Sequence, residues 1–96
     1  MLFVIAATDK PNALELRMAT RAAHFDYAKE TGAVRLGGPF LDGSGDMAGS
    51  MIIIEAADLA AAKAWAANDP YAKAGLFASS DVRPWKATFN PSGVQF

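Results

Sequence analysis

The sequence predicts an α+β protein in which a four-stranded antiparallel sheet carries two helices on one face. Three observations support this prediction. Residues 2–7 and 51–54 are continuous apolar runs, which indicate buried strands. Residues 14–30 and 59–67 have the flanking residues typical of helices, and each follows a strand. The resulting order β-α-β-β-α-β is that of the ferredoxin-like fold, with the first and third strands in the centre of the sheet.

The first helix is expected over residues 14–30, after a turn at 8–12. Asn12 is a candidate for its N-cap, because asparagine side chains accept hydrogen bonds from free backbone N–H groups at a helix start. Gly32 suits the left-handed position that ends many helices.

The second and third strands are expected at 34–41 and 49–56. The sequence Gly37-Gly38-Pro39 interrupts the former, which suggests an edge strand or a bulge.

The second helix is expected at 59–67, rich in alanine and capped by Asp58. Pro70 suits the first position of a short extra turn. The last strand lies within 77–89, where Pro84 again indicates a sheet edge.

Length and charge limit the kind of protein this is. The 96 residues allow one compact domain with its own core. We expect a single domain over 1–96, with its core in 1–89 and a loosely held tail in 90–96. The net charge is −1 and the basic residues are scattered, so no nucleic-acid partner is expected. The opening apolar run is too short for a signal peptide or a membrane span, which favours a cytoplasmic location without a membrane partner.

Cysteine is absent and histidine occurs once. These counts argue against disulfides, zinc sites built on thiolates, cysteine nucleophiles and a multi-histidine metal site within one subunit. We therefore predict no metal and no cofactor.

The two central strands are apolar on both faces. Antiparallel strands with one wet face normally alternate between apolar and polar residues, and two helices can cover only one face. A second copy of the chain is the simplest cover for the other face. We therefore predict a homodimer in which sheet faces sheet.

The helix at 14–30 holds the main functional clue. At about 100° per residue, His24, Arg17 and Arg21 fall near the middle of the face that should be buried. Burying such groups is costly unless they are paired or neutralised. The helix should therefore overlook a polar pocket, or a carboxylate from elsewhere should meet it.

Two carboxylates are candidates for pairing with His24. Asp69 precedes Pro70 and also has the position of a helix N-cap, and Asp9 ends the first strand near the start of the helix. The residues alone leave both open. A partly buried imidazole can act as a general base or acid, and a carboxylate on its other nitrogen would fix its tautomer.

Four further residues are candidates for ligand contacts. Arg17 and Arg21 are salt-bridge residues or, if they line a pocket, partners for an anionic or phenolate oxygen. Ser50 is an ordinary strand serine or a donor to a ligand. Gly38 permits a bulge or a close approach of the backbone to a ligand. Four aromatic residues are interpreted as core or dimer contacts rather than as stacking partners of a substrate, namely Phe40, Tyr71, Phe77 and Trp85.

An ordered set of short motifs runs through the chain from residue 1 to about residue 89. Its members are Asp9-Lys10, Arg17, Arg21-Ala22-Ala23-His24, Gly38-Pro39, Gly49-Ser50, Ala67-Asn68-Asp69-Pro70-Tyr71 and Arg83-Pro84-Trp85-Lys86. In this set the chain resembles the YciI-like (YCII-related) proteins.

The resemblance implies a small dimeric α+β-barrel protein. It also implies that a histidine and an aspartate act together, at His24 and Asp69, and it ranks Asp69 above Asp9. Some related proteins eliminate HCl from chlorinated aromatic compounds. The wider superfamily includes cofactor-free monooxygenases and lactone isomerases.

Three hypotheses for the function follow. The first is a cofactor-independent enzyme in which His24 and Asp69 transfer a proton on a small cyclic or aromatic substrate, by elimination or isomerisation. The second is a non-catalytic dimer that binds a small anionic ligand or a protein partner. The third is a purely structural role, which requires the polar cluster to be fully paired internally.

Overall fold

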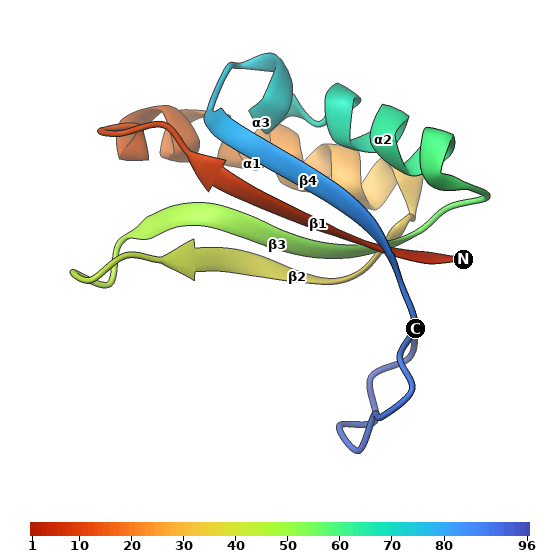
Figure 1. Ribbon diagram of the computed structural model, residues 1–96. Coiled ribbons are helices and arrows are strands. Elements are labelled where there is room, and N and C mark those ends of the chain that lie inside the picture. Colours follow the sequence, from red (N-terminus) through yellow and green to blue (C-terminus); the bar gives the residue numbers. More distant parts are fainter.

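The computed structural model describes residues 1–96 and has the predicted element order (Figure 1). The elements are β1 (Leu2–Asp9), α1 (Leu14–Thr31), β2 (Val34–Leu41), β3 (Met47–Glu55), α2 (Leu59–Asn68), α3 (Pro70–Lys73) and β4 (Phe77–Trp85). The strands form one sheet in the order β2-β3-β1-β4, and every neighbouring pair is antiparallel. The ferredoxin-like α+β fold is thus confirmed, with β1 and β3 in the centre.

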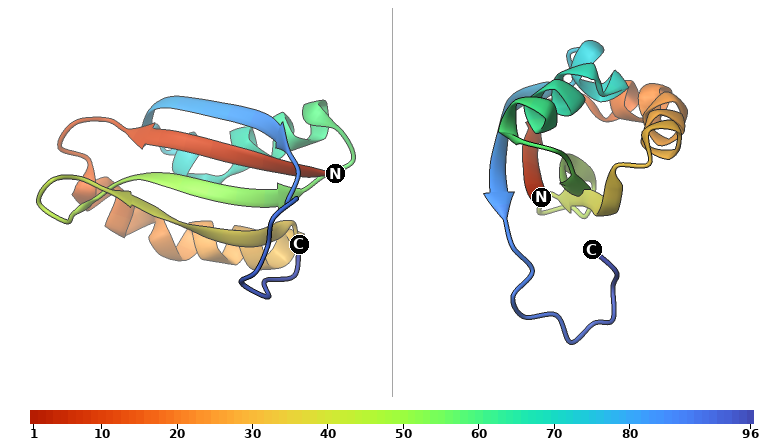
Figure 2. Two further views of the ribbon diagram at one scale, coloured as in Figure 1. Left: turned by 60° about the horizontal axis from the view of Figure 1, so that its bottom comes forward. Right: turned by 90° about the vertical axis from the view of Figure 1, so that its right-hand side faces the viewer.

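The helices lie on one face of the sheet (Figures 1 and 2). Because successive residues of a strand point to opposite faces, Phe3 of β1 and Ile52 and Ile54 of β3 share the face that the helices cover. With Ile5 they form the core together with Ala62 of α2. Ser50 lies on the same face of β3, two residues from Ile52, so a polar side chain sits beside this core.

α1 ends as predicted but begins differently. Gly32 has a φ of +63°, and its N–H donates to the carbonyl of Ala28. The N-cap position belongs to Ala13, and no side chain caps the helix there. The prediction for Asn12 is therefore wrong. Asn12 has a φ of +57°, a left-handed conformation that asparagine tolerates, so it shapes the preceding turn.

α2 and α3 meet at Asp69. Asp58 caps α2 as predicted, because its carboxylate accepts the N–H of Ala61. The Asp69 side chain accepts the N–H of Tyr71 and so caps α3, which starts at Pro70. This cap fixes one carboxylate oxygen of Asp69 in space.

The two edge strands are β2 and β4, as their prolines indicate. The pairing of β2 shifts register at Val34–Leu36 and at Phe40–Leu41. Gly37 and Gly38 lie between these shifts and pair regularly with β3. A bulge at the two glycines themselves is therefore not found.

The face of the sheet opposite the helices is uncovered (Figure 2). Seven residues of β2 and β3 line a groove of about 230 Å³ there, namely Leu36, Gly37, Gly38, Pro39, Phe40, Met51 and Ile53. Residues 86–96 contain no helix or strand and form a loop on this side of the sheet (Figures 1 and 2), and the Phe96 ring at its end lies 5.6 Å from the Trp85 ring of β4. The division into a core and a loosely held tail stays a prediction. No helix combines the length and the apolar composition that crossing a bilayer requires.

Candidate active site

The inner face of α1 is polar. Arg17 and His24 are its only buried residues, with exposed fractions of 3% and 9%. They are seven residues apart, about two helical turns, and therefore lie on one side of the helix. The helix thus directs charged and polar groups at the sheet, and its stability depends on how they are paired.

Arg17 forms a two-point ion pair with Asp9. Its Nε donates to one Asp9 carboxylate oxygen at 2.8 Å, and its Nη2 donates to the other at 3.0 Å. The same Nη2 donates to the Gly49 carbonyl at 2.7 Å and to Ser50 Oγ at 2.8 Å. Burial alone would lower the pKa of Arg17, but the hydrogen bonds and charge of Asp9 raise it above its usual value. This group therefore joins α1 to β1 and β3 as a permanent cation.

His24 pairs with Asp69, through a contact of 2.8 Å between Nδ1 and Oδ1. Oδ1 also accepts the backbone N–H of Tyr71 at 2.9 Å. Because this oxygen is an acceptor, the neutral histidine carries its proton on Nδ1 and leaves the lone pair on Nε2. No protein group binds Nε2. Because every fully buried side-chain nitrogen and oxygen has a hydrogen-bond partner, Nε2 is not fully buried.

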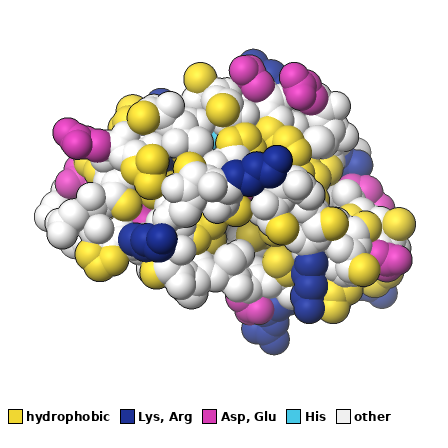
Figure 3. Space-filling model, turned by 90° about the horizontal axis from the view of Figure 1, so that it is seen from above, with side chains coloured by type: hydrophobic (Ala, Val, Ile, Leu, Met, Phe, Trp, Pro, Cys, Tyr) yellow, Lys and Arg dark blue, Asp and Glu magenta, His cyan; other side chains and the backbone are white.

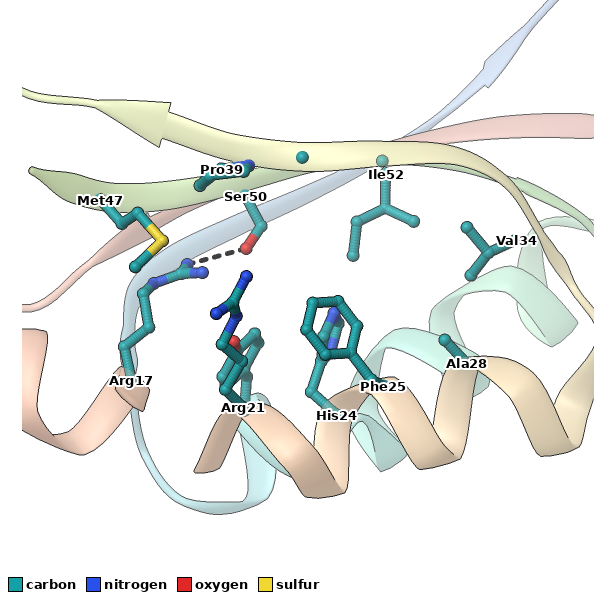
Figure 4. A pocket seen from close by; sticks show the side chains of 13 residues that line it. Arg17, Arg21, His24, Phe25, Ala28, Val34, Pro39, Met47, Ser50 and Ile52 are labelled. Atoms are coloured by element: carbon teal, nitrogen blue, oxygen red, sulfur yellow. Dashed lines mark hydrogen bonds between the residues drawn. The ribbon is translucent and has the colours of Figure 1, made fainter. Parts of the chain in front are cut away.

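A pocket of about 320 Å³ lies between α1 and the β2–β3 part of the sheet. Arg17, Arg21 and His24 point from α1 toward the sheet in Figure 4, which also labels Ser50 and Ile52 on β3. The lining combines polar groups with an apolar wall that includes Phe25, Ala28, Val34, Met47 and Ile52. Such a pocket suits a small ring with polar substituents.

Arg21 differs from Arg17 because it has no ion pair. Its side chain is exposed at the pocket, with Cζ 5.1 Å from the centre of the Phe25 ring. Arg21 is thus the positive charge of the pocket that no protein carboxylate offsets. The charge of Arg17, in contrast, is offset by the Asp9 carboxylate, and Arg17 also donates to the Ser50 hydroxyl.

Gly38 and Ser50 both line the pocket. Ser50 is buried and accepts from Arg17, so its hydroxyl hydrogen is available to another acceptor. A Cβ built on Gly38 would meet no atom within 4 Å, so packing does not demand a glycine there.

Tyr71 also lines the pocket, although a core or dimer contact was the preferred interpretation of this residue. Its ring stacks on the His24 ring at 4.2 Å between centroids, with 19° between their planes. Burial raises its pKa, and the charges of Arg17 and Arg21 oppose this rise without cancelling it. Its position two residues after Asp69 was the signal available in the sequence.

His24 is nearly hidden when the molecule is viewed from its helical side (Figure 3). In the view onto the helices, apolar side chains lie among scattered charges, and the histidine is almost entirely hidden (Figure 3). The site is thus a recess between the helix and sheet layers.

The fold and this recess define a small α+β protein of ferredoxin-like topology, with a buried His-Asp pair beside a ligand-sized pocket. Residues 1–86 match the model of the YCII-related domain. The chain belongs to the YCII-related family.

Two curated relatives cover nearly the whole chain. Protein YciI of Escherichia coli is 38% identical over 98 residues, which is 93% of this chain and 100% of the relative. An uncharacterized protein of Haemophilus influenzae is 39% identical with the same coverage.

Two solved structures extend the comparison. The 5-chloro-2-hydroxyhydroquinone dehydrochlorinase TftG of Burkholderia phenoliruptrix, solved in complex with 2,5-dihydroxybenzoquinone, is 38% identical with a TM-score of 0.82. The match covers 90% of this chain and 94% of TftG. A structure described as an antibiotic biosynthesis monooxygenase shares the fold alone, at 20% identity and a TM-score of 0.57, over 91% of this chain and 98% of that one.

Proposed function

We propose that this protein is a small cofactor-independent enzyme that eliminates or isomerises a small cyclic or aromatic substrate bearing an anionic oxygen. The observation that carries the proposal is the state of the His24 ring. Its Nδ1 is hydrogen-bonded to Asp69, and its Nε2 has no protein partner beside the pocket. A general base needs this combination of fixed tautomer and free lone pair.

In the proposed elimination, Nε2 of His24 takes a proton from a carbon or hydroxyl of the bound ring. The electron pair left behind forms a new double bond, and the leaving group departs with its own bonding pair. The resulting imidazolium is stabilised by the Asp69 carboxylate through Nδ1–H. In an isomerisation the same proton returns to another atom of the ring.

The pocket's positive charge supports an anionic substrate. Arg21 has no carboxylate partner, so we assign to it the oxygen that gains negative charge during proton transfer. Ser50 adds a hydroxyl donor nearby. Arg17 contributes a fixed charge at the edge of the pocket, with Asp9 as its structural partner. We assign no role in binding to the Gly38 side of the pocket beyond leaving room for the ring.

The similarity to TftG supports the reaction class. Its name describes a dehydrochlorinase, and its ligand is a ring with several oxygen substituents. At 38% identity and a TM-score of 0.82, such a ring is a reasonable first substrate class for this chain. The natural leaving group can differ.

The proposal is tested with 5-chloro-2-hydroxyhydroquinone as a trial substrate and chloride release as the measurement. We expect release by the parent protein and a loss of roughly 10²–10⁴-fold in His24→Ala, because the general base is gone. Met18→Ala, an exposed position on the same helix, is the control and should keep the parent rate. Release by His24→Ala at the parent rate would rule out the His-Asp mechanism.

The alternative is a non-catalytic module that binds a small anion or a protein partner. The unpaired Arg21 is the observation that favours it, because anion recognition needs that charge and no general base. Tight binding of 2,5-dihydroxybenzoquinone without turnover of any related ring would favour this alternative over the enzyme.

We also propose that the protein is a homodimer whose uncovered sheet faces meet. The groove on that face is built from apolar side chains and glycines, with Ile53 already buried within one chain. Leu36, Phe40 and Met51 remain more than a third exposed beside it. Contiguous exposed apolar surface of this kind marks protein interfaces.

A further inference from the structure

We propose that Tyr71 is a ligand-binding residue of the pocket, whose hydroxyl donates a hydrogen bond to the anionic oxygen of the ligand. This inference rests on the proposed function, because it concerns the same pocket and the same ligand class. It adds a donor that lies outside the His-Asp pair and the two arginines.

The first observation is an unused donor. Tyr71 is only 2% exposed, and a buried tyrosine hydroxyl normally finds a partner. The protein offers this hydroxyl no acceptor. Every fully buried side-chain nitrogen and oxygen has a hydrogen-bond partner, so the hydroxyl is not fully buried. We infer that it opens onto the pocket that the ring lines. Tyr27, the other tyrosine, differs because its hydroxyl donates to the Trp65 carbonyl at 2.8 Å.

The second observation is that the ring is held in place from several sides. His24 stacks on it at 4.2 Å, and Arg17 Cζ lies 4.7 Å from its centre. Its backbone N–H is bound to Asp69. The hydroxyl is therefore preorganised beside the histidine, and little conformational freedom is lost when it binds a ligand.

The third observation is the charge state. Burial raises the pKa of Tyr71, and the neighbouring charges of Arg17 and Arg21 lower it by less. The hydroxyl therefore stays protonated at neutral pH and acts as a donor. The two guanidiniums make the same corner favourable for a negatively charged oxygen.

The test compares the binding of 2,5-dihydroxybenzoquinone to the parent protein, Tyr71→Phe and Tyr27→Phe by calorimetry. We expect Tyr71→Phe to bind roughly 10- to 100-fold more weakly, because a hydrogen bond to a charged oxygen is lost. Tyr27→Phe is the matched control and should bind like the parent, because its hydroxyl serves the Trp65 carbonyl. Thermal unfolding of both variants checks that the fold is intact.

Equal affinity of Tyr71→Phe and the parent would overturn the inference and leave the proposed function standing. If the parent itself fails to bind the probe, the proposed ligand class is contradicted and the role of Tyr71 falls with it. Should Tyr71→Phe unfold, the parent labelled with ¹³C at tyrosine Cζ decides the question. The probe should then shift the Tyr71 signal and leave the Tyr27 signal in place, and an unmoved Tyr71 signal would contradict the inference.

Discussion

Arg17 and His24 meet the same burial problem in different ways. Arg17 directs its Nε and Nη2 donors to protein acceptors, with Asp9 as the main one, and so stabilises the junction of α1 with the sheet. His24 binds Asp69 through one nitrogen and leaves the other toward the pocket. This difference is why we assign proton transfer to His24 and a structural charge to Arg17. A purely structural role would require the whole cluster to be paired internally, and Arg21 has no ion pair.

Tyr27 and Tyr71 make the stability of the protein sensitive to alkaline pH. Burial raises the pKa of both above the ordinary value of 10.0, with the charge of Asp69 adding to the rise in Tyr27. As the pH rises, the unfolded chain therefore loses its tyrosine protons before the folded chain does. The contribution of the two tyrosines to the free energy of unfolding is fully present below about pH 10 and falls as the pH rises through their raised pKa values. Urea unfolding at several pH values between 8 and 11 should follow this decline.

The free energy of unfolding of Tyr71→Phe should decline less steeply than that of the parent over that range, because one of the two ionising tyrosines is removed. Equal slopes in both proteins would contradict the raised pKa of Tyr71.

At the residue level, the sequence could place His24 and Arg17 on one helix face, because helical periodicity is local. It could not choose between Asp69 and Asp9, because that choice depends on contacts between distant elements. Asp69 lies 45 residues from His24. Tyr71 was interpreted as a core or dimer contact because buried aromatic residues most often pack in such places, and only its place in the pocket suggests another role.

β3 and β1 approach closely at Gly49, and this contact positions the site. A Cβ at Gly49 would overlap the Ala7 carbonyl oxygen. The carbonyl of Gly49 accepts a hydrogen bond from Arg17. We expect Gly49→Ala to lower the free energy of unfolding by about 1–3 kcal/mol, as overpacking does. Gly38→Ala is the control, because a Cβ there meets nothing within 4 Å. Urea unfolding measures both, and equal effects would contradict the close approach.

The elements themselves were largely predictable. Apolar runs predicted the central strands, because strand burial leaves a local signal. Asp58 and Gly32 predicted the start of α2 and the end of α1, because helix caps also leave local signals. The start of α1 was not predictable in the same way. Asn12 has the side chain of an N-cap, but the turn gives it a left-handed backbone, which is incompatible with capping.

At the scale of the whole molecule, the proposed dimer can be tested at its exposed apolar face. Met51→Lys places a charge on the uncovered side of β3, and we expect it to convert the dimer to a monomer in light scattering. Met18→Lys is the control, since Met18 is comparably exposed, 47% against 39%, but lies on α1. A parent protein that scatters as a monomer at micromolar concentration would contradict the dimer.

We propose that Asp69 holds the proton of His24 on Nδ1 and leaves Nε2 free for the substrate. Nitrogen-15 NMR of the imidazole tests it directly, because the chain has one histidine and its two ring signals need no further assignment to a residue. At a pH where the ring is neutral, we expect a protonated Nδ1, an unprotonated Nε2 and a change at Nε2 when 2,5-dihydroxybenzoquinone is added. A ring protonated on Nε2, or an Nε2 signal that the ligand leaves unchanged, would contradict a role of His24 as the general base.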